Sequence, residues 1–160
     1  MEQNDNDAPQ PMDVYEMPMK WHKYLIYFSL WAAAVMNVIA GVAALTGSVY
    51  VLRGADPEMI YRSYEGLKTF DVMLGLTDIV LAVLLIVTRF ALAGYKENGP
   101  RLLMISYAVN IAFTLVCPII AVAIRLPVGR LFGAPAAIEN IVMLAVNRIY
   151  YHKRAHLFVN

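Results

Sequence analysis

Charged side chains are scarce in this chain of 160 residues, since they make up 16% of it while 60% of its residues are hydrophobic. Soluble domains carry about 25% charged residues. The single cysteine, Cys117, excludes an intrachain disulfide and argues against cysteine ligation of a metal. A formal net charge of +1 argues against nucleic-acid binding. This composition predicts a membrane protein.

The chain also lacks the short motifs of common enzyme classes. It contains no HExxH, no GxxxxGK[ST], no GxSxG, no CxxC and no GxGxxG. Its apolar stretches leave no room for a soluble catalytic domain. We therefore expect no enzyme activity and no cofactor or metal.

Four apolar stretches are long enough to cross a bilayer, which takes roughly 20 residues. They cover about residues 24–52, 70–88, 102–124 and 131–151. The predicted fold is all-α, a polytopic membrane protein with four transmembrane helices in an antiparallel bundle within residues 20–154. Residues 1–19, acidic and with three prolines, are expected to be a disordered cytoplasmic tail, and residues 155–160 a cytoplasmic C-terminal end.

Between the first two spans, "GADPEMIYRSYEG" predicts a short surface helix. Asp56 is suited to the N-cap, Pro57 to the first helical position and Glu58 to the first turn. Met59, Ile60 and Tyr64 would then face the membrane.

The distribution of Lys and Arg predicts the orientation, because short loops rich in these residues stay cytoplasmic. Eight of them flank the two ends of the chain and the second loop, and five lie in the first and third loops. Both termini are therefore expected on the cytoplasmic side of a cell membrane.

Each span carries small or polar residues at steps of three and four, which fall on one helix face. Such faces suit helix contacts in membranes, where small residues allow close approach and polar ones hydrogen-bond across. We call these faces the seams. The packing positions expected on them are Gly41, Ala44, Gly75, Ser106 and Thr114.

Asp78 lies well inside the second apolar stretch, and its seam also carries Asp71. Counted back from Arg89, Asp78 lies about 16 Å above the inner side, while Asn110, counted from Arg101, lies about 14 Å above it. Glu139 and Asn140 of the fourth stretch fall at about 12–14 Å. The sequence thus predicts a polar belt near the midplane, with its side chains facing the bundle. Its members are Asp78, Glu139, Asn110 and Asn140.

The two carboxyls of this belt allow two interpretations. A charged carboxylate at that depth costs at least about 2.5–3.5 kcal/mol unless it is paired or hydrated. Both acids could be protonated and hydrogen-bonded to nearby Asn and Thr side chains, which would hold the bundle together. They could also form a proton or cation site, as intramembrane acids do in transporters.

All three histidines, His22, His152 and His156, are expected on the inner side as solvated interfacial side chains. A metal site built from them is disfavoured by Lys153 and Arg154. The segment "NRIYYHKRAHLFVN" is typical of a basic and aromatic anchor on anionic lipid. Its cluster of cations is small and does not imply recognition of a specific lipid.

The segments "DVMLGLTDIVLAVLLIVTRFALAGYKENGPRLL" and "NRIYYHKRAHLF" resemble small uncharacterised four-helix membrane proteins of bacteria. The resemblance covers most of the three later spans. It implies a location in the bacterial cytoplasmic membrane and no known activity, and it assigns no functional residues.

The sequence is compatible with two functions. The first is a structural or interaction protein that assembles through its seams. The second is a proton- or cation-coupled small transporter or channel subunit that uses Asp78 and Glu139. The lipid bilayer is the expected surrounding, and a partner protein would be another copy of the chain or another membrane protein.

Overall fold

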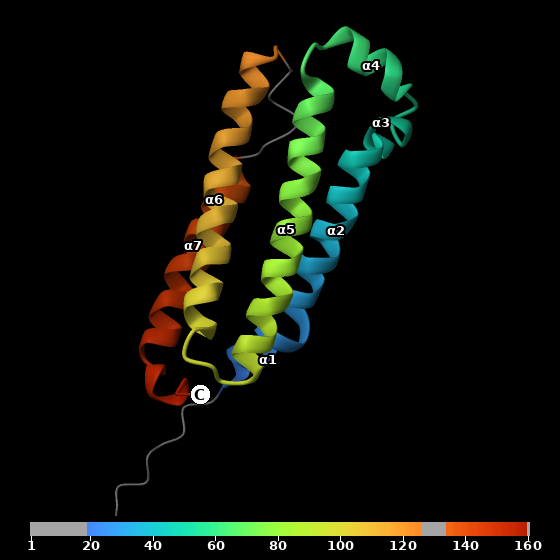
Figure 1. Cartoon of the computed structure of the whole chain (residues 1–160). Coiled ribbons are helices and arrows are strands. Elements are labelled where there is room, and N and C mark those ends of the chain that lie inside the picture. Colours follow the sequence, from blue (N-terminus) through green and yellow to red (C-terminus); the bar gives the residue numbers. More distant parts are fainter. Residues whose placement is uncertain (1–18, 126–133, 160) are drawn as a thin grey trace, which may run out of the picture.

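The computed structural model describes residues 19–125 and 134–159, and the regular structure in these ranges is helical (Figure 1). The elements follow one another along the chain as α1 (Lys20–Tyr24), η2 (Leu25–Ser29), α2 (Leu30–Thr46), α3 (Ser48–Val51), α4 (Pro57–Ser63), α5 (Leu67–Ala93), α6 (Gly99–Ala123), α7 (Ala134–His152) and η4 (Ala155–Leu157). The expected tail therefore lies outside the described residues, except for Met19, and so does the start of the fourth expected span.

Within the described residues, three helical stretches are long and apolar enough to cross a membrane: Lys20–Thr46, Leu67–Ala93 and Gly99–Ala123. The first begins earlier than expected and ends earlier, because Gly47 takes up a left-handed conformation with φ 70° that closes α2. The other two helices begin a few residues before the predicted spans 70–88 and 102–124, and Leu67–Ala93 also ends later than predicted. The fold is all-α, as predicted, with three candidate membrane spans.

Helix α7 has 19 residues and is not one of these three candidates. It carries several polar side chains, among them Glu139, Asn147 and Arg148. It packs along α6, which in turn packs against α5 (Figure 1).

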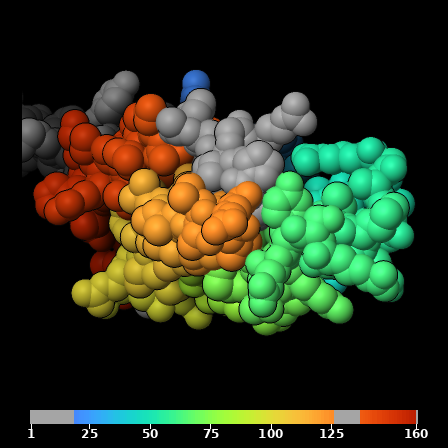
Figure 2. Space-filling view, turned by 90° about the horizontal axis from the view of Figure 1, so that it is seen from above, coloured from blue at the N-terminus to red at the C-terminus, as the bar shows by residue number. Residues whose placement is uncertain are grey.

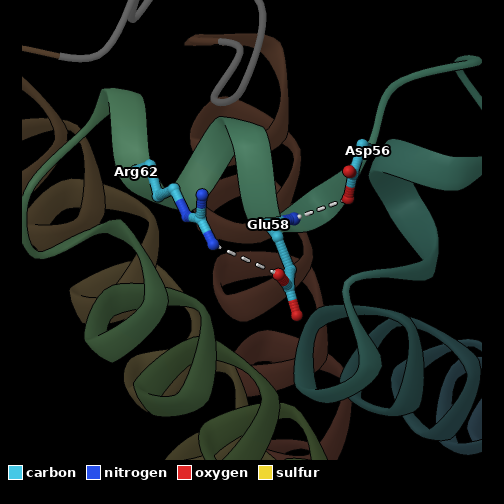
Figure 3. Close-up of polar contacts among 3 residues, drawn as sticks. All are labelled: Asp56, Glu58 and Arg62. Carbon is cyan, nitrogen blue, oxygen red and sulfur yellow. Dashed lines mark hydrogen bonds and ion pairs between the residues drawn. The ribbon is translucent and has the colours of Figure 1, made fainter.

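The short helix α4 forms as the sequence predicts, and Figure 3 shows its first turn. The Asp56 carboxylate accepts a hydrogen bond from the Glu58 backbone N–H at 2.9 Å, and Pro57 occupies the first helical position. The exposed Arg62 and Glu58 side chains approach to 3.7 Å. Such an exposed pair contributes little to stability, because water screens it.

One face of α4 packs onto the protein instead of facing the membrane as expected. Its residues Ile60 and Tyr61, with Tyr64 just after the helix, lie against a buried cluster at the start of α5. Met59 is 65% exposed. Figure 2 looks down on this end of the molecule, where α4 and the adjoining ends of α5 and α6 form much of the visible surface.

The most extensive helix contact is between α2 and α5, and two glycines allow it. A Cβ atom added to Gly41 would lie 2.9 Å from the Gly75 carbonyl oxygen, and one added to Gly75 would lie 2.7 Å from the Gly41 carbonyl oxygen. Ala34 and Ala82, both almost fully buried, lie level with each other in the same antiparallel register. Two residues of the expected seams therefore meet inside a single chain.

Two apolar clusters lie towards opposite ends of the bundle. The cluster at the end that holds α1 and the C-terminus consists of Leu25, Ile26, Leu30, Leu92, Leu103, Tyr151 and Phe158. The cluster at the α4 end consists of Leu67, Phe70, Cys117 and Ala121. We call the end with α1 and the C-terminus the inner end and the end with α4 the outer end, and we name the two clusters accordingly.

Candidate functional site

Asp78 lies near the middle of α5 and is half-buried. Gly75 and Ala82, which share its helix face, are buried, so this face is turned towards the bundle. The Asp78 carboxylate interacts electrostatically with the thiol of Cys117 on α6. Asp78 is therefore an interior carboxyl at the contact between two candidate spans.

The register of α5 and α6 differs from the one expected. The hydroxyls of Thr88 and Ser106 lie 3.3 Å apart, which places Asp78 level with Cys117. Asn110 then lies roughly six residues nearer the inner end, a rise of about 9 Å. The expectation that Asp78 and Asn110 lie at one depth is wrong, because α5 continues past Arg89 to Ala93 before the chain turns.

Glu139 does not share the environment of Asp78. It is exposed on α7, and its charge acts on the hydroxyl of Tyr107 of α6. In the described ranges, Asp78 and Glu139 therefore have different neighbours and are not paired with each other. Asn140 is half-buried and has an interaction partner of its own.

The remaining seam residues make contacts within the chain. Ser106 is buried and donates to the Leu102 carbonyl at 2.9 Å. Thr114, half-buried, donates to the Asn110 carbonyl at 2.8 Å. Ala44 is half-buried in the last turns of α2.

Asp71 joins the elements of the outer end. Asp71 is 7% exposed, and its carboxylate accepts a hydrogen bond from the Tyr50 hydroxyl of α3 at 2.8 Å. The Tyr61 hydroxyl of α4 also donates to this carboxylate. Desolvation, followed by the charge and hydrogen bond of Asp71, raises the pKa of Tyr61 to about 12. The pKa of Tyr50 is also raised, first by desolvation and then by its own hydrogen bond to Asp71.

A second polar network ties the inner end together. The Trp21 indole N–H donates to the Asn147 side-chain oxygen at 2.9 Å. The Asn147 amide lies 3.4 Å from the Tyr107 hydroxyl and 2.8 Å from the Met143 carbonyl, and Asn147 is fully buried. This network connects the start of the first span to α6 and α7.

His22 corrects the expectation of a solvated histidine. It is fully buried, its Nδ1 lies 3.0 Å from the Tyr151 hydroxyl, and the ring packs against Tyr95 and Phe158. His152 and His156 are exposed. In the described part of the chain no group of three or more His, Cys, Asp or Glu residues could hold a metal.

Arg89 makes contacts within the bundle that the sequence does not predict. Its Nε donates to the Ile26 carbonyl at 3.2 Å, within the π-helical turn η2. Its guanidinium lies over the rings of Trp31 and Phe90, with 5.4 Å and 4.7 Å to the ring centres. A π-helical turn displaces the regular carbonyl ladder, and Arg89 binds one of the carbonyls in that turn.

Comparisons with protein-family models, with curated proteins and with solved structures find no match to this chain.

Proposed function

We propose that this chain is an integral membrane protein of structural or interaction type, without enzymatic activity. The observation that supports this most is the use of its polar side chains. Many of those inside the bundle are engaged with other parts of the chain and join separate elements. The pairs are Tyr50 with Asp71, Thr88 with Ser106, and Trp21 with Asn147.

Four membrane crossings form part of this proposal. Helix α7 is about 28 Å long at 1.5 Å per residue, close to the thickness of the hydrocarbon core. In Figure 1, α1 and the C-terminus lie at the same end of the bundle, as an even number of crossings requires. The excess of Lys and Arg at that end supports a cytoplasmic location for both, and a bacterial cytoplasmic membrane fits the resemblance noted above.

Glu139 supports an interaction role. An exposed carboxylate on α7 would be costly if it faced the hydrocarbon of the membrane. Contact with another copy of the chain or with another membrane protein would cover it. The close approach of Gly41 and Gly75 serves packing within one chain, so the proposed contact between proteins uses another surface, centred on α7.

The second candidate function is a proton- or cation-coupled transporter or channel subunit. Asp78 favours it, because this half-buried carboxyl faces the bundle between α5 and α6. The exposed position of Glu139 weakens it, since a pair of acids sharing a proton or cation would have to lie close together.

Ion flux in proteoliposomes separates the two functions. We expect purified protein to carry no more proton or sodium flux under a gradient than protein-free liposomes. Asp78→Asn should then remain folded and differ from the wild type only in stability. Wild-type flux that is abolished in folded Asp78→Asn, and that persists in the exposed control Glu58→Gln, would overturn the structural proposal in favour of transport.

A further inference from the structure

A groove at the inner end of the bundle gathers positive charge from three separate segments. Its volume is about 1350 Å³. Lys96 comes from the loop between α5 and α6, Arg101 from the first turn of α6, and Arg148 from the last turns of α7, where His152 also lines the groove. Glu97 is the acidic residue in the lining.

These cations have no carboxylate partner in the described part of the chain. The ion pair found there joins Arg62 and Glu58, at the opposite end of the molecule. Lys96, Arg101 and Arg148 are exposed. The side chains of Lys96, Arg101 and Arg148 are therefore free to bind an anion in the groove.

The start of α6 adds to the positive potential. Its N-cap residue Asn98 makes no side-chain capping bond, and both Asn98 and Pro100 line the groove. The amino end of a helix carries partial positive charge, which favours anions. Here it adds to the side-chain charges of Lys96 and Arg101.

The groove also has an apolar part. Met104, Phe158 and Val159 line it beside the charged residues. Phe158 belongs to the inner cluster, which continues into the candidate spans. A ligand that combines a phosphate with an acyl chain would contact the cations with its headgroup and these side chains with its chain.

We propose that this groove binds a phosphate group, and specifically the headgroup phosphate of an anionic phospholipid on the side of the membrane where α1 and the C-terminus lie. The proposal goes beyond the structural role proposed above and does not depend on it. A free phosphate has the same headgroup chemistry but no acyl chain, so the two sources can be told apart.

Native mass spectrometry of the full-length protein in detergent, titrated with phosphatidylglycerol or phosphatidylcholine, measures the binding. We expect the wild type to prefer phosphatidylglycerol. Each cation near an anionic surface contributes about 1 kcal/mol, so Arg101→Gln with Arg148→Gln should weaken binding about thirtyfold, which corresponds to ~2 kcal/mol at 1.4 kcal/mol per tenfold. Lys96→Gln, a loop substitution outside the helices, should weaken it about fivefold.

The matched control is Arg53→Gln with Arg125→Gln, which removes two exposed cations from the opposite end. This pair should leave phosphatidylglycerol binding unchanged. Equal weakening by both pairs, or no preference for phosphatidylglycerol in the wild type, would overturn the proposal. Inorganic phosphate should not displace the lipid at equal concentration, and displacement would assign the groove to a soluble anion instead.

Discussion

The contact between Gly41 and Gly75 makes a sharp prediction about stability. Gly75→Ala would place a Cβ atom 2.6 Å from Leu45 Cγ and 2.7 Å from the Gly41 carbonyl oxygen. The carbonyl belongs to the backbone of α2, so the clash is relieved only if the two helices move apart. Overpacking of this kind costs about 1–3 kcal/mol, and the better helix propensity of alanine returns about 0.5–1 kcal/mol. The difference of the two ranges is about 0–2.5 kcal/mol, and because a backbone carbonyl cannot turn aside as a side chain can, we expect a net destabilisation of at least about 1 kcal/mol.

The measurement is equilibrium unfolding in mixed micelles with increasing SDS, with Gly94→Ala as the control. A Cβ at Gly94 has its nearest neighbours at 3.4–3.9 Å, which are ordinary contacts, so this change should fall within about 0.5 kcal/mol of the wild type. The double variant with Gly41→Ala should cost less than the sum of the single changes, because the first substitution already separates the helices. Gly75→Ala that is as stable as the wild type would refute the close contact of α2 and α5.

Three further predictions concern the polar networks. Tyr50→Phe removes the hydrogen bond to Asp71 and should cost about 0.6 kcal/mol, at most about 1.7 kcal/mol, in the same unfolding assay; an unchanged curve would show that the bond contributes nothing. Asn147→Ala leaves the Trp21 indole N–H without its acceptor and should cost about 1–3 kcal/mol, whereas exposed Asn98→Ala should be nearly neutral. Because folding raises the pKa of Tyr61 to about 12 from an ordinary 10.0, its contribution to stability is fully present below pH 10 and is lost as the pH rises through 12. Titration of phenolate absorbance in the wild type and in Tyr61→Phe measures this, and ionisation of Tyr61 at its ordinary pKa would contradict the contact with Asp71.

Local features of the fold could be predicted from the sequence, because they depend on neighbouring residues. The cap of α4 needs only Asp56, Pro57 and Glu58 in succession, and the structure confirms it. The spacing of small residues in the sequence also predicts the seams of the first two spans, which include Gly41 and Gly75. The pattern did not say which helix each face would meet, because that depends on how the chain turns.

The helix register and the burial of particular side chains depend on contacts between residues far apart in the sequence. The depth predicted for Asp78 assumes that Arg89 marks the membrane surface, but Arg89 is folded inward against η2. The sequence predicts a solvated His22, but its ring is buried against Tyr151 and Phe158, which come more than a hundred residues later. Such contacts form only when the two ends of the chain come together.

Asp71 shows the same limit at the outer end. Its place on a polar helix face could be recognised, but its partners lie on α3 and α4, which fold back over the end of α5. The left-handed Gly47 sets the direction of that return. If the first helix continued straight to residue 52, as the sequence predicts, Tyr50 would lie further along the axis of that helix and away from Asp71.

Thiol labelling of single cysteines in intact cells shows whether the chain crosses the membrane four times with both ends inside, as we propose. The buried Cys117 is first replaced by serine, and one cysteine is then placed at Glu58, Asn98 or Val159. We expect an impermeant reagent to label the cysteine at Glu58 from outside, and to label those at Asn98 and Val159 only after the membrane is permeabilised. Labelling of Val159 from outside would show that α7 does not complete a fourth crossing, and labelling of Asn98 with protection of Glu58 would contradict the orientation itself.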